Sequence, residues 1–185
     1  MTLRLFVAIA MCFAVSACSG YRRPPAAFHE MLTQPYRLDS SDTVRIIVFG
    51  QTDLSNTYAI DQAGYISFPL IGNVAARGRT QQELSQEIAR KLKQGYLRDP
   101  DVSVEVATYR PIFVMGEVQS AGQYSYVTGM TVQNAIATAG GFSPRAQQKS
   151  VDITRQINGE ILNGRVPISD PIRPGDTIYV RERYF

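Results

Sequence analysis

The sequence predicts an α+β fold in two parts: a small strand-hairpin-helix-strand unit, followed by a β-grasp-like unit. Two observations support this prediction. Segments with alternating apolar residues, typical of half-buried strands, occur throughout both parts. Each part also holds one segment with helical spacing of apolar residues that opens on a threonine. We expect the first unit to span residues 36–108 and the second to span residues 109–185.

The first unit opens with a strand in YRLDSSDTVRIIVFG, where Val44, Ile46 and Val48 share one face. A turn at Asp61–Gly64 then indicates a hairpin. The apolar and aromatic residues expected in the strand after this turn are Tyr65, Ile66, Phe68 and Leu70.

A helix follows in GRTQQELSQEIARKLKQGY. Thr80 and Glu83 stand at capping-box spacing, and Gly95 is the expected end. The predicted buried line is Leu84, Ile88 and Leu92. After Asp99–Pro100, the alternating segment 102–106 predicts a strand packed on this helix.

The second unit begins with a strand in RPIFVMGEV and a turn at Ala121–Gly122 into YSYV. TVQNAIATAGGF predicts a short helix that begins after Thr131 and ends at Gly140–Gly141. VDITR predicts a strand, INGEILNGRVP a hairpin, and DPIRPGDTIYVRERYF a turn into the last strand.

Two segments resemble each other. DSSDTVRIIV and RPGDTIYVRE each place a turn and an aspartate before an alternating strand. An internal duplication is one explanation, and the general preference of Asp and Gly for turns is the other.

Residues 1–17 are predicted to be a secretory signal, because Arg4 precedes an apolar run that is shorter than the about 20 residues of a membrane span. Val15-Ser16-Ala17-Cys18 resembles the lipobox of bacterial lipoproteins. This resemblance implies cleavage between Ala17 and Cys18 and lipid attachment to Cys18; ordinary signal-peptide cleavage is the alternative. Ser19, in place of the aspartate that retains enteric lipoproteins at the inner membrane, favours the outer membrane. Residues 18–35, with three prolines, are expected to form a lipidated tether.

Composition and spacing argue against several function classes. A formal net charge of +3 with scattered basic residues does not predict nucleic-acid binding. The single histidine, His29, lies in the tether without metal-ligand spacing, and Asp101 and Glu105 would stand about 13 Å apart on a strand, too far for a glycosidase pair. No glycine cluster has phosphate-cradle spacing. We therefore predict no catalytic, metal or cofactor site, and no enzyme.

The segment from Ile60 to Val106 resembles the export-signature domain of outer-membrane polysaccharide export proteins of the Wza type. The residues that match the family pattern are Asp61, Gly64, Pro69, Leu70, Gly72, Gly78, Thr80, Leu84, Asp99 and Pro100. One local departure is Ser40-Ser41-Asp42, where the family usually has Pro-Gly-Asp before the first strand.

The segment PIFVMGEVQSAGQYSYVTGMTVQNAIATAGGFSP resembles the soluble-ligand-binding β-grasp (SLBB) module that follows the signature domain in this family. The matching residues are Gly116, Val118, Gly122, Ala139, Gly140, Gly141, Pro174, Gly175 and Asp176. Ala121 replaces a common proline.

The resemblance implies a protein anchored by lipid to the periplasmic side of the outer membrane, forming a homo-oligomeric ring that passes a polysaccharide from an inner-membrane copolymerase to an outer-membrane exit. The signature domain would line the lumen or form its mouth, and the β-grasp module would supply subunit contacts. Because Phe185 directly follows a strand, with no C-terminal transmembrane helix, the resemblance is to the short class of the family, which would need a separate outer-membrane channel or would act as a periplasmic collar beneath one. The alternative function is a monomeric periplasmic glycan-binding or sensory lipoprotein. A glycosidase would require two carboxylates that folding brings together.

Overall fold

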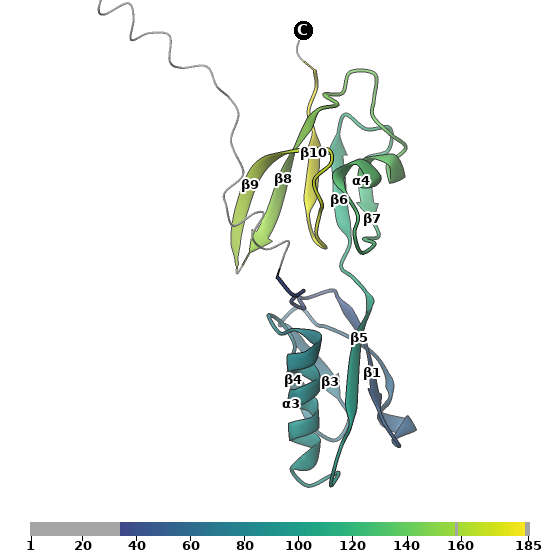
Figure 1. The fold of residues 1–185 in the computed structure, drawn as a ribbon, viewed down its shortest axis with the longest axis vertical. Coiled ribbons are helices and arrows are strands. Elements are labelled where there is room, and N and C mark those ends of the chain that lie inside the picture. Colours follow the sequence, from purple (N-terminus) through teal and green to yellow (C-terminus); the bar gives the residue numbers. More distant parts are fainter. Residues whose placement is uncertain (1–33, 158, 184–185) are drawn as a thin grey trace, which may run out of the picture.

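The computed structural model describes residues 34–157 and 159–183, which form two domains placed end to end (Figure 1). The mixture of helices and strands in both domains confirms the predicted α+β class. The predicted signal, the cleavage site Ala17–Cys18, the lipid-attachment residue Cys18 and His29 lie outside the described residues.

The first domain is built from one three-stranded antiparallel sheet, one hairpin and one helix. The sheet has the order β2-β1-β5, with β1 (Thr43–Val48) between β2 (Asn56–Ala59) and β5 (Val102–Thr108). A short 3-10 turn, η2 (Thr52–Leu54), joins β1 to β2. Val44, Ile46 and Val48 all point into the core, as their alternation predicts.

Helix α3 (Gln81–Lys93) covers the core of the first domain. Its capping box forms as predicted: the Thr80 hydroxyl accepts from the Glu83 N–H, and the Glu83 carboxylate accepts from the Thr80 N–H. Gly95 follows the last turn with φ of 125°, a conformation that favours glycine. The predicted line of Leu84, Ile88 and Leu92 is fully buried.

The position of the predicted hairpin was wrong by one turn. Strand β3 (Tyr65–Phe68) pairs with β4 (Gly72–Ala75), so the hairpin tip is at residues 69–71 and not at Asp61–Gly64. The turn at Asp61–Gly64 connects β2 and β3, which belong to different sheets. Leu70, expected in a strand, lies in the tip with φ of 68° and is 55% exposed.

The second domain has a five-stranded mixed sheet in the order β7-β6-β10-β8-β9. Its strands are β6 (Ile112–Gly116), β7 (Gly122–Tyr124), β8 (Ser150–Ile157), β9 (Glu160–Pro167) and β10 (Thr177–Val180). The last strand, β10, is inserted in the middle, parallel to β6 and antiparallel to β8.

Helix α4 (Val132–Thr138) packs on one face of this sheet and shares a core with β6, β8 and β10. Thr131 caps it as predicted, and Gly140 and Gly141 end it with positive φ. A sheet that wraps one short helix confirms the β-grasp-like prediction. Among the residues that the structure describes, no helix is both long and apolar enough to cross a membrane.

Candidate functional site

Two turns with the same hydrogen bonding lie where the domains meet. The first Asp turn, Asp39–Asp42, leads into β1, and the second Asp turn, Arg173–Asp176, leads into β10. In each, the N–H of the last residue, Asp42 or Asp176, donates to the carbonyl of the turn's first residue, at 3.2 Å and 3.1 Å. The aspartate carboxylate accepts from the N–H of that same residue, at 2.9 Å and 2.7 Å. The third residue is left-handed in both turns, with φ of 72° at Ser41 and 84° at Gly175.

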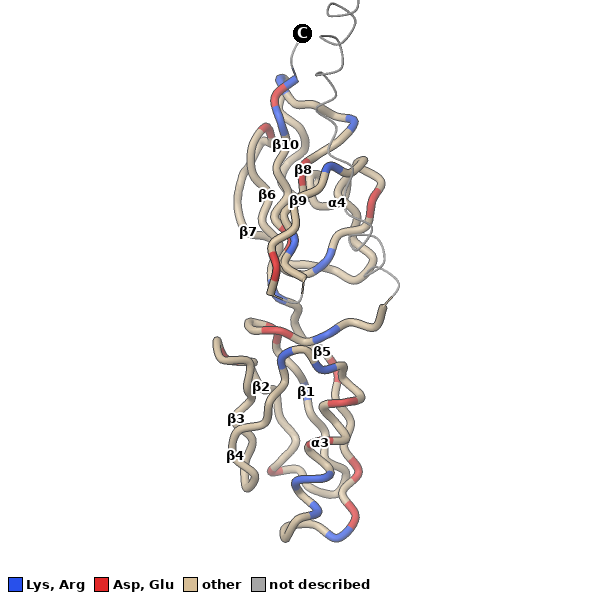
Figure 2. The backbone as a smooth tube through the Cα atoms, turned by 90° about the vertical axis from the view of Figure 1, so that its left-hand side faces the viewer, with Lys and Arg blue, Asp and Glu red and all other residues tan. Residues whose placement is uncertain are grey.

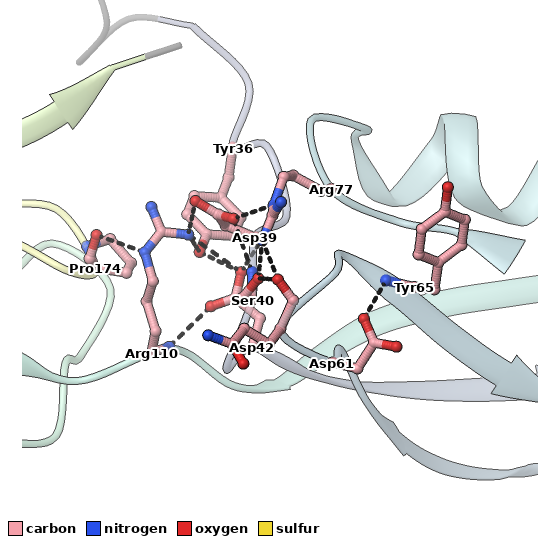
Figure 3. A network of polar contacts seen from close by, with 10 residues as sticks. Tyr36, Asp39, Ser40, Asp42, Asp61, Tyr65, Arg77, Arg110 and Pro174 are labelled. Carbon is pink, nitrogen blue, oxygen red and sulfur yellow. Dashed lines mark hydrogen bonds and ion pairs between the residues drawn. The ribbon is translucent and has the colours of Figure 1, made fainter. Parts of the chain in front are cut away.

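Arg110, in the link between the domains, bridges the two Asp turns (Figure 3). Its backbone N–H donates to the buried Asp42 carboxylate at 2.8 Å, and its Nε donates to the carbonyl of Pro174 at 3.1 Å. Its Nη1 also lies 3.6 Å from carboxylate oxygens of both Asp39 and Asp42. The backbone and side chain of Arg110 thus link the turn that precedes β1 to the turn that precedes β10.

Tyr36 also contacts residues of both domains where they meet. Its hydroxyl donates to Asp42 at 2.6 Å, and its ring packs edge-on to Tyr109, which packs edge-on to Tyr126 of the second domain. Burial, with a smaller contribution from the Asp42 carboxylate, raises the pKa of Tyr36. The hydroxyl therefore keeps its proton and remains a donor to Asp42.

A buried ion pair joins the second Asp turn to strand β8. Arg155 donates from Nε and Nη2 to the two oxygens of Asp176, at 2.8 Å and 2.6 Å, and the side chains are only 3% and 1% exposed. Arg155 points inward because β8 alternates, and Val151 and Ile153 share its face. The geometry is bidentate, the arrangement in which an arginine and a carboxylate match best.

A cleft of about 590 Å³ lies between the domains, and both Asp turns line it. Among the described residues, five arginines line it but only two carboxylates do, Asp39 and Asp176, so this part of its wall carries an excess of positive charge. The arginines are Arg37, Arg77, Arg110, Arg155 and Arg173. Figure 2 shows both basic and acidic segments gathered at this junction.

Three glycines of the family motifs lie next to these arginines and either leave space for the side chain or accept a hydrogen bond from it. A Cβ on Gly64 would lie 2.5 Å from the Cβ of Arg77, and a Cβ on Gly175 would lie 2.6 Å from Nε of Arg110. Gly78 has φ of 76°, and its carbonyl accepts from Arg37 at 2.5 Å. Arg77 in turn contacts Asp39 at 2.9 Å and the Gln62 carbonyl at 2.7 Å. These three glycines of the family motifs therefore form part of the backbone next to the arginines that line the cleft.

The other predicted signature residues of the first domain lie in its turns and caps. Asp61 accepts from the Tyr65 N–H at 2.8 Å (Figure 3), and Thr80 caps α3. Pro69 and Leu70 form the tip of the β3–β4 hairpin and Gly72 begins β4, while Asp99 and Pro100 precede β5.

In the second domain, a Cβ on Gly116 would lie 2.1 Å from the Val180 carbonyl oxygen, so this position needs a glycine. Gly122 begins β7, and Ala139, Gly140 and Gly141 end α4. Pro174, Gly175 and Asp176, which form most of the second Asp turn, are the only SLBB-like signature residues that line the cleft.

Sequence analysis missed most of the cleft. It did not single out Arg77, Arg110, Arg155 or Arg173 as site residues. One signal was present: an arginine at the inward phase of VDITRQI indicates a buried partner. In the described parts of the chain, no three His, Cys, Asp or Glu side chains are grouped closely enough to hold a metal ion.

Comparisons with known proteins match both domains. Residues 31–107 match the family described as polysaccharide biosynthesis/export protein, and residues 111–166 match the SLBB domain. An export domain followed by an SLBB domain defines a class of polysaccharide export proteins. Together with the names of the curated relatives, the two matches support a Wza-type polysaccharide export family, as the sequence motifs predicted. These are non-enzymatic transport families, in agreement with the prediction that the chain is not an enzyme.

Curated relatives carry consistent names. The exopolysaccharide production protein ExoF of Rhizobium meliloti is 36% identical over 57% of this chain and 28% of its own length. The EPS I polysaccharide export outer membrane protein EpsA of Ralstonia solanacearum is 31% identical over 80% of this chain and 48% of its own length. The polysialic acid transport protein KpsD of Escherichia coli is 26% identical over 80% and 28%, respectively. The chain thus spans less than half the length of each of these relatives.

Proposed function

We propose that the protein is a periplasmic component of exopolysaccharide or capsule export, anchored to the outer membrane by lipid on Cys18. In this proposal a homo-oligomeric collar passes polymer from an inner-membrane copolymerase toward an outer-membrane exit. The observation that carries the proposal is the pairing of an export domain with an SLBB domain, together with relatives named as export proteins of the outer membrane. The domain limits at residues 36–108 and 109–185 are part of the proposal.

An exposed apolar patch supports oligomerisation. Phe113 and Met115 on β6 and Tyr179 on β10 lie on the sheet face opposite α4 and are 42%, 46% and 47% exposed. Aromatic and methionine side chains in the centre of a sheet face are typical of a surface that another chain covers. A second copy that contacts this patch through a different surface gives a head-to-tail contact, and repeated contacts of this kind form a ring when the rotation between neighbouring subunits closes.

The bridged junction supports a collar as well. Arg110 contacts both Asp turns, and the tyrosine series continues from Tyr36 to Tyr126. Subunit contacts made by one domain would therefore also position the other domain around the central axis of the collar. A lumen lined by repeated first domains is the expected result.

The test is a gene deletion in a strain with no second copy, followed by measurement of polysaccharide in the medium and in the cell envelope. We expect release to fall in the deletion strain, to return with the wild-type gene and to return poorly with Cys18→Ala. A Ser19→Ala variant, one residue away, is the matched control and should restore release. Unchanged release in the deletion strain would overturn the proposal.

The second candidate is a monomeric periplasmic glycan-binding or sensory lipoprotein. The cleft of about 590 Å³ favours it, because receptor sites are commonly concave and of this size. A stable monomer together with normal polymer release would place this function first.

A further inference from the structure

The cleft has one arginine that the described residues leave without an acidic partner. Arg37, Arg77, Arg110 and Arg155 each have a carboxylate within 4.0 Å, supplied by Glu83, by the first Asp turn or by Asp176. The Arg173 guanidinium donates to the carbonyl of Gln34 at 3.4 Å, and among the described residues no carboxylate lies within 4.0 Å of it. The charge of Arg173 is therefore available to a ligand.

The surroundings of Arg173 increase its preference for an anion. It is partly buried, and burial, followed by the positive charge of Arg155, lowers its pKa, although the Asp176 carboxylate acts in the opposite direction. An anion in the cleft would reverse this effect, because it would stabilise the charged guanidinium. The backbone of Arg173 is fixed by its N–H bond to Asp176, so the side chain projects from a rigid turn.

The size and composition of the cleft limit what the anion can be. A volume of about 590 Å³ exceeds what one inorganic ion fills and lies in the range of small organic ligands. Gln62 and Gln156 also line the cleft, and their amides can bond to hydroxyl groups. A carboxylate beside several hydroxyls is the chemistry of an acidic sugar, and a guanidinium fork matches a carboxylate.

We propose that the interdomain cleft binds an acidic sugar unit of the exported polymer, with Arg173 as the partner of its carboxylate. This inference rests on the proposed export function and narrows it to polymers that carry carboxylates. Residues of both Asp turns line the cleft, so a bound sugar would contact both domains.

The test is calorimetric titration of the purified mature chain with a tetrasaccharide of glucuronic acid, a neutral malto-tetraose and inorganic phosphate. We expect the acidic tetrasaccharide to bind and the neutral one to bind far more weakly. Arg173→Gln should weaken the acidic interaction about tenfold or more, and Arg173→Lys should weaken it less. Arg145→Gln is the matched control, because Arg145 is 71% exposed, pairs with Glu117 and Glu182 and does not line the cleft.

Three results would overturn the inference. They are equal affinity for the neutral tetrasaccharide, unchanged affinity in both Arg173 variants, and displacement by phosphate at a concentration equal to that of the sugar, which would indicate a simple anion site. Urea midpoints of each variant separate lost binding from lost folding, and Arg173→Lys retains the charge if Arg173→Gln does not fold.

Polymer release distinguishes this inference from the proposed function. If deletion of the gene abolishes release while the purified chain binds no acidic sugar, the cleft inference fails and the export function stands. If the chain binds acidic sugar through Arg173 but deletion leaves release unchanged, the export function fails and the binding site stands.

Discussion

The buried pair of Arg155 and Asp176 gives the most quantitative prediction. The two side chains are 3% and 1% exposed, and Asp176 also accepts from the backbone of the second Asp turn. Arg155→Met would leave the Asp176 carboxylate buried without the guanidinium that now contacts both of its oxygens. Loss of one member of such a pair costs about 3–5 kcal/mol, because the remaining charge stays out of water.

A surface pair supplies the control for this substitution. Arg45 and Glu105 are joined at 2.7 Å but are 56% and 58% exposed, so Arg45→Met should cost less than about 1 kcal/mol. The double variant Arg155→Met with Asp176→Leu should lose less than the two single variants together, because it removes both charges.

Urea unfolding followed by circular dichroism measures these differences, provided that the slope of the transition is unchanged. A loss for Arg155→Met within about 1 kcal/mol of the loss for Arg45→Met would refute the reasoning. That result would mean that water or another group solvates Asp176 when the arginine is absent.

Three further predictions use the same unfolding assay. Ser41→Gly should raise the unfolding free energy by about 0.5–1 kcal/mol, since glycine relieves the left-handed backbone; a loss would show that the serine side chain stabilises the turn. Gly116→Ala should cost about 1–3 kcal/mol more than Gly129→Ala, because both have positive φ but only the former would place Cβ against the Val180 carbonyl; equal losses would contradict this. Because burial raises the pKa of Tyr36, the folded state keeps a proton that the unfolded chain releases above about pH 10, so stability should fall as the pH rises above that value, and should fall less in Tyr36→Phe; equal slopes would contradict it.

Local structure was largely predictable because short-range physical chemistry determines it. Thr80 and Thr131 cap their helices, since a threonine oxygen in that position accepts from the first free N–H groups. The alternation in β1 placed Val44 and Ile46 in the core. The hairpin was misplaced because the segment through Leu70 was interpreted as one strand, although Pro69 before Leu70 and Gly72 after it are turn signals.

The candidate site was less predictable because long-range contacts build it. Arg110 and Asp42 are 68 positions apart, and β10 enters the sheet between β6 and β8, which no local pattern indicates. The sequence similarity around the two Asp turns was visible, and the structure shows that it corresponds to equal hydrogen bonding before the central strand of each sheet. Only their common position at the cleft required the three-dimensional structure.

The most direct test of the proposed collar is the subunit number of the lipidated protein, extracted in mild detergent and examined by analytical ultracentrifugation and single-particle electron microscopy. We predict a closed ring with a central opening that dissociates in Tyr179→Ser with Met115→Ser, but not in Val127→Ser, whose parent residue is 66% exposed elsewhere in the same domain. A monomer at all concentrations, or a ring that the two patch substitutions leave intact, would contradict the account.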